Sequence, residues 1–169
     1  MEILASYYSS PIGLLELTAS EKGLASLLFV EEKKHEEDDQ NEFLKRTSQQ
    51  LDEYFNSKRS SFDIPLDPAG TKFQRNVWNE LQNIPFGKTI SYLELSLALG
   101  DEKLTRAVGS ANGKNPIAII IPCHRVIGND GKLTGYAGGL WRKEFLLKHE
   151  GVLKSSNQVS IFTETELNS

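Results

Sequence analysis

Short runs of apolar and polar residues alternate over the first 30 positions, separated by turns rich in Pro and Gly. The runs are "LASYYSS", "LLELTAS" and "LASLLFV", and the turns are "PIG" and "EKG". Such alternation between turn residues is typical of a small antiparallel sheet. Residues 43–57 instead carry apolar side chains at helical spacing, which predicts an amphipathic helix packed on that sheet.

Two sequences of the capping-box type mark helix starts in the second half. Thr71 with Gln74 opens the segment "KFQRNVWNELQNI", and Ser91 with Glu94 opens "YLELSLALG". In a capping box the two side chains satisfy the first free backbone N–H groups of the helix. Asp101 then predicts the start of a third helix, "EKLTRAVGSAN". Two short helices joined by a brief turn have the outline of a helix-turn-helix, which is a weak signal by itself.

The remaining segments predict a strand, a hairpin and a last helix. The run "IAIII" (117–121) is apolar and rich in β-branched residues, so it predicts a buried strand. "GNDGKLTG" predicts a turn of a wing-like hairpin. "GGLWRKEFLLKHEG" predicts an amphipathic helix, with Gly151 as its C-terminal cap.

Together these elements predict an α+β fold in two domains. A small N-terminal antiparallel sheet with a helix, of structural role, covers residues 1–62. The segment 63–70 has two prolines and one glycine and predicts a linker. A mostly helical, winged-helix-like domain covers 71–151. We expect the polar tail 152–169 to be flexible.

The composition narrows the class of protein. The 169 residues are 38% apolar and 25% charged, as in a soluble globular protein. We expect no membrane helix, because no stretch approaches roughly 20 apolar residues, and no signal peptide, because the N-terminus lacks a basic start. One cysteine forms no internal disulfide, which favours a reducing, cytoplasmic location.

The charges are segregated along the chain. Residues 1–70 hold 7 Lys or Arg against 14 Asp or Glu, whereas residues 71–151 hold 11 against 7. The second half therefore suits a polyanion as partner, although the net charge of the whole chain is −4.

The single cysteine, Cys123, lies in the segment "IPCHRV". Lone cysteines are most often small buried apolar residues. Here Pro122 removes a backbone donor just before the cysteine, and His124 and Arg125 place positive charge beside it. A neighbouring cation lowers the pKa of a thiol and favours the reactive thiolate. Because neighbours on a strand point to opposite faces, either the strand ends at Pro122 or a water links the thiol to the imidazole.

Two further residues allow an ordinary and a functional interpretation. Glu150 ends the last predicted helix, where a carboxylate faces the negative end of the helix dipole at a cost of about 0.3–1 kcal/mol. It is either a surface residue paired with Lys148 or Arg142, or the acid that orients His124. Asn115 precedes a proline, so it either makes a turn or ties the cysteine segment to the preceding helix.

Two tyrosines present the same choice between packing and function. Tyr92 begins the first short helix of the helix-turn-helix, where an aromatic ring more often packs than reacts. Tyr136 lies among glycines in "TGYAGG", which leave its ring little to pack on, so it could line a pocket for a planar ligand.

Residues 71–151 closely resemble the catalytic domain of the O6-alkylguanine-DNA alkyltransferases, also called methylated-DNA–protein-cysteine methyltransferases. The resemblance rests on "FQRNVWNELQNIPFGKTISYLELSLALG", "RAVGSANGKNP", "IPCHRVI" and "GYAGGLWRKEFLLKHEG", in that order and spacing. Residues 1–62 resemble the N-terminal domain of the family more loosely. The resemblance implies DNA repair by direct reversal: an alkylated guanine is flipped out of the duplex, and a cysteine takes the alkyl group once, irreversibly and without a cofactor.

The resemblance also implies a role for individual residues. The implied catalytic residues are Cys123 as alkyl acceptor, His124 as the base that deprotonates it through a water, Glu150 as the acid that holds the histidine, Asn115 as the brace of the cysteine loop and Tyr92 as a donor to N3 of the leaving guanine. The implied DNA-binding residues are Arg106, which takes the place of the flipped base, and Ala107, Gly109, Ser110, Lys103 and Arg125. The implied substrate pocket contains Tyr136, Ala137 and Gly138.

Two features depart from the family pattern. Ala137 stands where many relatives have a serine hydroxyl, so a backbone N–H would replace one polar contact to the substrate. Some relatives bind zinc in the first domain, but here that domain has one histidine and no cysteine, and we expect no metal. The expected partner is double-stranded DNA, bound through its minor groove by a monomer that needs no protein partner and no membrane.

Three other classes of protein remain as alternatives. A non-catalytic, alkyltransferase-like lesion binder would lack the cysteine, so Cys123 argues against it. A winged-helix regulator leaves "IPCHRV" and Glu150 unexplained. A cysteine hydrolase would need a nucleophile turn such as Gly-x-Cys-x-Gly, which the sequence lacks.

Overall fold

The computed structural model describes residues 3–153, so most of the predicted tail, 154–169, lies outside the described residues. The chain forms two compact units. Of the described residues, unit 1 contains 3–69 together with 116–120, and unit 2 contains 70–115 and 121–153. The change of unit falls at the end of the predicted linker, but the return of 116–120 to unit 1 was not predicted.

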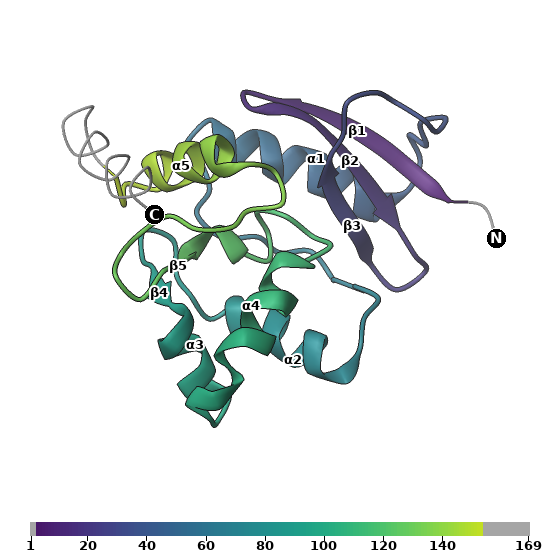
Figure 1. The fold of residues 1–169 in the computed structure, drawn as a ribbon. Coiled ribbons are helices and arrows are strands. Elements are labelled where there is room, and N and C mark those ends of the chain that lie inside the picture. The colour runs from purple at the N-terminus through teal and green to yellow at the C-terminus, as the bar shows by residue number, and fades with distance from the viewer. Residues whose placement is uncertain (1–2, 154–169) are drawn as a thin grey trace. The chain divides into compact units, whose positions relative to one another are not determined.

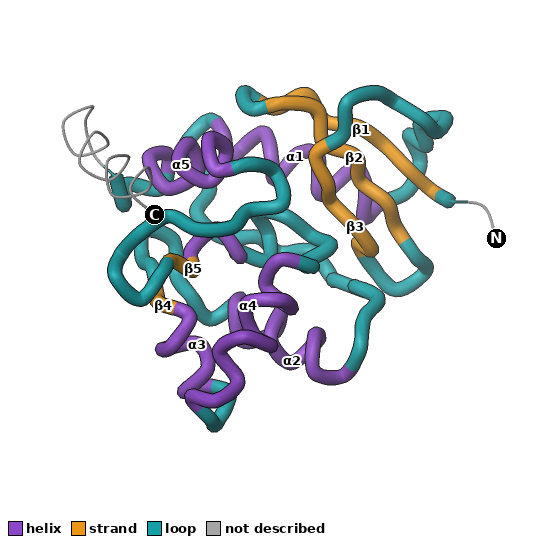
Figure 2. Tube along the Cα trace, in the orientation of Figure 1, coloured by secondary structure: helices purple, strands orange, loops and turns teal. Residues whose placement is uncertain are grey.

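Unit 1 is a three-stranded antiparallel sheet with one helix (Figures 1 and 2). The strands β1 (Leu4–Ser10), β2 (Gly13–Ala19) and β3 (Leu24–Phe29) pair in the order β1-β2-β3. The helix α1 (Glu42–Phe55) begins at Asn41, whose side chain accepts from a backbone N–H of the first turn. The predicted sheet and helix are therefore confirmed.

The core of unit 1 forms where α1 lies on the sheet. The large, fully buried side chains that the strands and the helix contribute are those of Leu15, Leu17, Leu24, Leu27, Leu44, Leu51 and Tyr54. Burial of each leucine stabilises the fold by roughly 1.5–3 kcal/mol. Gly23 permits the close approach of the later segment, because a Cβ there would lie 2.4 Å from the carbonyl oxygen of Pro65.

Unit 2 is mostly helical, and its elements follow one another along the chain. They are α2 (Lys72–Leu81), β4 (Ile90–Ser91), α3 (Tyr92–Ala98), the 3₁₀ helix η1 (Glu102–Leu104), α4 (Thr105–Gly113), the 3₁₀ helix η2 (Cys123–Arg125), β5 (Val126–Ile127) and α5 (Leu140–His149). Both predicted capping boxes are present, at the starts of α2 and α3. The predicted α+β class is confirmed.

The third predicted helix is divided into two parts. Asp101 caps η1 by accepting from Lys103 N at 2.9 Å, and α4 then begins at Thr105. The indole N–H of Trp78 on α2 donates to the Ala111 carbonyl of α4 at 2.9 Å, inside the core. This bond fixes α4, the second helix of the predicted helix-turn-helix, against α2.

Two predicted elements are wrong. The run 117–121 is buried but is no strand: only Pro116 O and Ala118 N bond to Leu27, and Ile119 then adopts a φ of +70°. This left-handed conformation, costly for a β-branched residue, ends the pairing. The predicted wing-like hairpin is a turn that Gly128 N closes on Lys132 O at 2.8 Å. No paired strand follows it among residues 128–153.

Candidate active site

Cys123 begins the 3₁₀ helix η2, directly after an abrupt turn. Pro122 has φ −82° and ψ 63°, and Cys123 N donates to Ile121 O at 2.8 Å, as in an inverse γ-turn. The extended segment therefore ends at Pro122, which is one of the two alternatives that the sequence left open. In a 3₁₀ helix successive side chains are about 120° apart, so Cys123 and His124 are not held on opposite faces.

Asn115, at the end of α4, holds the segment that precedes the cysteine. Its side-chain Nδ2 donates to Ile121 O at 2.7 Å, and its side chain also hydrogen-bonds to Cys123. Asn115 is buried. Of the two interpretations from the sequence, the structure thus shows an amide tied to the cysteine segment.

The thiol of Cys123 is buried, and burial raises its pKa. The hydrogen bond from Asn115 and the positive charge of Lys143 act in the opposite direction but do not cancel this effect. The resting group at neutral pH is consequently the thiol, because burial disfavours the charged form. The thiol needs a base before it can act as a nucleophile.

His124 supplies a base next to the thiol in sequence. Its ring is fully buried, and Nε2 lies 2.8 Å from Oε2 of Glu150. An ionised carboxylate only accepts, so Nε2 carries the proton and Nδ1 is the acceptor. Among residues 3–153, Nδ1 has no hydrogen-bond partner. Burial lowers the pKa of His124 more than Glu150 raises it, which keeps the imidazole neutral at rest.

Glu150 caps the C-terminal end of α5 and is 3% exposed. Burial alone would raise its pKa, but the hydrogen bonds from His124 and Arg125 and the positive charge of Arg125 outweigh burial and lower it well below its usual range. The carboxylate therefore stays ionised despite the unfavourable end of the helix dipole. The carboxylate bonds to the buried His124 and Arg125.

Arg125 corrects the sequence analysis, which counted it among the DNA-binding residues. Its side chain is 8% exposed, and its guanidinium donates to both oxygens of Glu150, at 2.8 and 3.0 Å, and to Ile84 O at 2.6 Å. A phosphate of DNA cannot reach a guanidinium used in this way. The sequence shows the charge of a residue but not the side of the chain to which it points.

Sequence reasoning missed Lys143, which is fully buried on α5. Its Nζ donates to Val126 O at 2.7 Å and to Thr134 O at 2.6 Å. Its spacing in the sequence could have indicated this burial, because Lys143 lies on the same apolar face of α5 as Leu146 and Leu147, where a lysine is unusual. Lys143 joins β5 to the loop that contains Tyr136 and adds a positive charge near Cys123.

The predicted pocket residues lie in a tight turn before α5. Gly139 N donates to Tyr136 O at 2.8 Å, and Arg142 donates to Gly138 O at 2.9 Å. The Tyr136 hydroxyl is buried and has no partner among the described residues. Burial raises its pKa well above the usual value, so it remains a neutral donor. Ala137, at the tip of the turn, is exposed.

The predicted DNA-binding residues of η1 and α4 share one exposed face. The exposed residues are Lys103, Arg106, Ala107 and Ser110, at helical spacing of three and four. Gly109 lies on the inner side, where a Cβ would be 3.9 Å from the ring of Tyr92. Tyr92 begins α3 and is half-buried, so its ring lies beside α4. The small residues that follow the two basic ones allow another surface to approach α4 closely.

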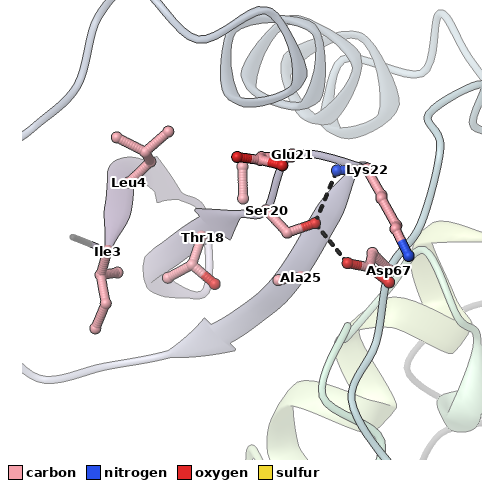
Figure 3. Close-up of a pocket in the computed structure, with 9 residues that line it drawn as sticks. Ile3, Leu4, Thr18, Ser20, Glu21, Lys22, Ala25 and Asp67 are labelled. Atoms are coloured by element: carbon pink, nitrogen blue, oxygen red, sulfur yellow. Dashed lines mark hydrogen bonds between the residues drawn. The ribbon is translucent and has the colours of Figure 1, made fainter. Parts of the chain in front are cut away.

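A hollow of about 550 Å³ lies in unit 1, and none of the predicted site residues lines it (Figure 3). Its polar groups bond to one another: Ser20 Oγ donates to Asp67 at 2.5 Å and accepts from Lys22 N at 3.0 Å. The remaining lining is mostly aliphatic, including Ile3 and Leu4. Nothing in this arrangement indicates a reaction.

Within 3–153, no group of three His, Cys, Asp or Glu side chains is placed to hold a metal ion. No helix in this range has the length and apolar character needed to cross a membrane.

Models of two protein families match the chain. The family described as "6-O-methylguanine DNA methyltransferase, DNA binding domain" matches residues 72–152. The family described as "6-O-methylguanine DNA methyltransferase, ribonuclease-like domain" matches residues 3–68. Together the two matches cover most of the described chain.

Known proteins and structures are also similar. A methylated-DNA–protein-cysteine methyltransferase of Methanosarcina acetivorans is 51% identical over 149 residues, covering 85% of this chain and 96% of the relative. The crystal structure of the Mycobacterium tuberculosis O6-methylguanine methyltransferase has a TM-score of 0.80 at 40% identity, covering 95% of this chain and 99% of that one. A structure of the M. tuberculosis protein in complex with DNA has a TM-score of 0.78 at 42% identity, covering 91% and 97%.

Proposed function

The chain belongs to the methylated-DNA–protein-cysteine methyltransferases, and from this membership we propose that it repairs O6-alkylguanine in duplex DNA by moving the alkyl group to Cys123. The observation that carries the proposal is the buried relay formed by Cys123, His124 and Glu150. In it, His124 follows the thiol directly in sequence, its Nδ1 is an acceptor without a partner among residues 3–153, and its Nε2 bonds to a carboxylate at 2.8 Å. This arrangement suits a thiol that must lose its proton only when a substrate is bound.

The alkyl transfer forms one bond and breaks one bond. The Cys123 proton passes to Nδ1 of His124 through a water, and Glu150 stabilises the resulting imidazolium. The thiolate then attacks the alkyl carbon, an S–C bond forms, and the C–O6 bond breaks with its electron pair on guanine. Tyr92 donates a proton to N3 of the leaving base. The imidazolium proton then passes through solvent to the Tyr92 oxygen, so that the step ends with neutral guanine, a neutral imidazole and the tyrosine hydroxyl.

The protein is used up by the reaction. The product at Cys123 is a thioether, which water does not cleave and which has no leaving group for a second transfer. Each molecule therefore repairs one lesion, and no cofactor is needed because the cysteine is the acceptor. O6-alkylguanine is the proposed substrate, and O4-alkylthymine is a second candidate.

The exposed face of η1 and α4 is the proposed DNA contact. Lys103 and Arg106 lie at its two basic positions, and Ala107 and Ser110 give the close approach that a minor groove requires. Arg106 would fill the place of the flipped base, and Tyr136 would line the pocket that receives it. The buried thiol supports base flipping, because the lesion inside a duplex cannot reach a cysteine that is 7% exposed.

The test uses duplex DNA that carries O6-methylguanine with a tritium-labelled methyl group. The proposal predicts that label moves to the protein up to one equivalent and then stops, and that Cys123→Ser transfers none. Label that stays on the DNA, or more than one equivalent released by each protein molecule, would contradict it.

A second measurement tests base flipping. Arg106→Ala should slow the reaction with duplex DNA more than the reaction with free O6-benzylguanine, since the free base needs no extrusion. Arg75→Ala is the matched control, because Arg75 is exposed on α2 and donates to a backbone carbonyl. Equal losses of Arg106→Ala in both reactions would contradict the proposed role.

A further inference from the structure

The guanidinium of Arg125 is turned into the relay rather than toward solvent. Its Nε donates to Oε1 of Glu150 at 2.8 Å, its Nη2 to Oε2 at 3.0 Å and its Nη1 to Ile84 O at 2.6 Å. The centroid of the Phe86 ring lies 5.9 Å from the central carbon, Cζ, of the Arg125 guanidinium. The loop after α2 thus holds one side of the guanidinium, while the other side meets the carboxylate.

The paired bonds fix the orientation of the carboxylate. Two parallel N–H donors hold both oxygens of Glu150 in the plane of the guanidinium, which a single-point donor such as lysine cannot do. Oε2, which accepts from Nη2, is also the oxygen that meets Nε2 of His124. Arg125 therefore decides how the carboxylate faces the imidazole.

Arg125 also balances the charge that His124 experiences. A buried carboxylate next to an imidazole favours the imidazolium. An imidazolium cannot accept the thiol proton, so an uncompensated Glu150 would inactivate the base. The guanidinium offsets this carboxylate, and Lys143 on α5 adds a second positive charge. The neutral thiol of Cys123 in the same 3₁₀ helix and the neutral hydroxyl of Tyr136 in the pocket turn add no charge at rest.

We propose that Arg125 is a positioning residue of the alkyl-transfer site, which fixes Glu150 in one orientation and keeps His124 uncharged until Cys123 gives up its proton. The proposal rests on the function proposed above. It gives the arginine after the cysteine and histidine a role inside the protein, in place of the DNA contact that its charge alone suggested.

The experiment measures the charge of His124 directly. The chain has three histidines, so ¹⁵N-histidine labelling gives a spectrum of three rings, and His124→Asn identifies the ring of interest. Wild type is compared with Arg125→Gln, which removes the positive charge, and with Arg125→Lys, which keeps the charge but lacks the two parallel N–H donors of the guanidinium. Arg59→Gln is the matched control, because Arg59 also donates to a carboxylate, that of Glu53, and to a backbone carbonyl.

The expected results differ between the two variants. In wild type, His124 is neutral at neutral pH with its proton on Nε2. In Arg125→Gln its pKa rises by about one pH unit or more, and alkyl transfer to Cys123 slows about tenfold at neutral pH. The rate recovers with rising pH only as far as that of Arg125→Lys, because glutamine also lacks the paired donors. In Arg125→Lys the His124 titration stays close to that of wild type, and the highest rate falls severalfold at every pH. Arg59→Gln changes neither measurement.

Three results would overturn the inference: a charged His124 in wild type at neutral pH, an unchanged His124 titration in Arg125→Gln, or a wild-type rate in Arg125→Lys. The first and the third remain decisive if Arg125→Gln does not fold. The titration needs no DNA and no alkyl transfer. A wild-type protein that transfers no alkyl group would therefore count against the proposed function, whereas the NMR results decide the role of Arg125.

Discussion

Replacing Lys143 with methionine tests how unit 2 is held together around the site. Methionine is similar in length, but it cannot donate to the buried carbonyls of Val126 and Thr134, which Nζ meets at 2.7 and 2.6 Å. Each carbonyl left unpaired costs about 1–3 kcal/mol. The variant no longer buries an ammonium group, which offsets part of that cost. We expect a net loss of about 2–4 kcal/mol, and a Tm lower by roughly 5–15 °C.

Tryptophan fluorescence during urea unfolding measures this loss. Both tryptophans lie in unit 2, so the signal reports the unit that contains Lys143. Lys148→Met is the matched control on the same helix, because Lys148 is 43% exposed and pairs with Glu144 only at 3.7 Å. The control should stay within about 0.5 kcal/mol of wild type. If Lys143→Met were equally close to wild type, the two carbonyl bonds would not have the importance assigned to them here.

The remaining predictions concern other contacts and pH. Trp78→Phe loses the buried indole bond to α4 and should destabilise unit 2 by about 1–3 kcal/mol in urea; an unchanged midpoint would mean that α4 is held by packing alone. Thr71→Ala removes a capping box and should cost about 1 kcal/mol, with full recovery in Thr71→Ser, and failure of serine to restore it would contradict the capping role. The free energy of unfolding should decrease below about pH 6.5, because the pKa of His124 is lowered in the folded protein and the unfolded histidine binds its proton first. It should decrease further below about pH 4.3, because the pKa of Glu150 is also lowered and the unfolded carboxylate binds its proton first. Stability should also fall above about pH 8.5, because the pKa of Cys123 is raised in the folded protein and the unfolded thiol ionises first. In Cys123→Ser this decrease at alkaline pH should be absent, while the decreases at acidic pH remain. Urea midpoints that do not vary between pH 4 and 10 would refute the assignment.

Helix starts could be predicted because their cause is local. The hydroxyl of Thr71 and the amide of Gln74 reach backbone groups within one turn, and Ser91 with Glu94 does the same. Such bonds depend on residues three positions apart, which the sequence shows directly. The alternation of the first 30 residues is likewise local, and the sheet that it predicts is present.

The segment before Cys123 could not be predicted in the same way. Its apolar residues are buried as expected, yet burial does not distinguish a strand from an irregular segment. The outcome depends on the two bonds to Leu27, far away in sequence, and on the left-handed backbone of Ile119. Neither feature leaves a local pattern.

In the candidate site, too, some features could be predicted from the sequence and others could not. The sequence placed Cys123, His124 and Glu150 together through a family resemblance, and the structure brings the histidine and the acid within 2.8 Å. It gave no means to tell that Arg125 and Lys143 point inward, because a charged residue is far more often exposed. Burial of both becomes reasonable only when their partners are known: a carboxylate for the arginine and backbone carbonyls for the lysine.

Mass spectrometry of peptides after reaction with O6-methylguanine duplex DNA gives the most direct test of the alkyl acceptor. We expect the peptide that contains Cys123 to gain one methyl group in place of the thiol hydrogen, with fragment ions that locate it on the sulfur. A methyl group on any other residue, or an unmodified Cys123 peptide after the lesion has gone from the DNA, would contradict the account.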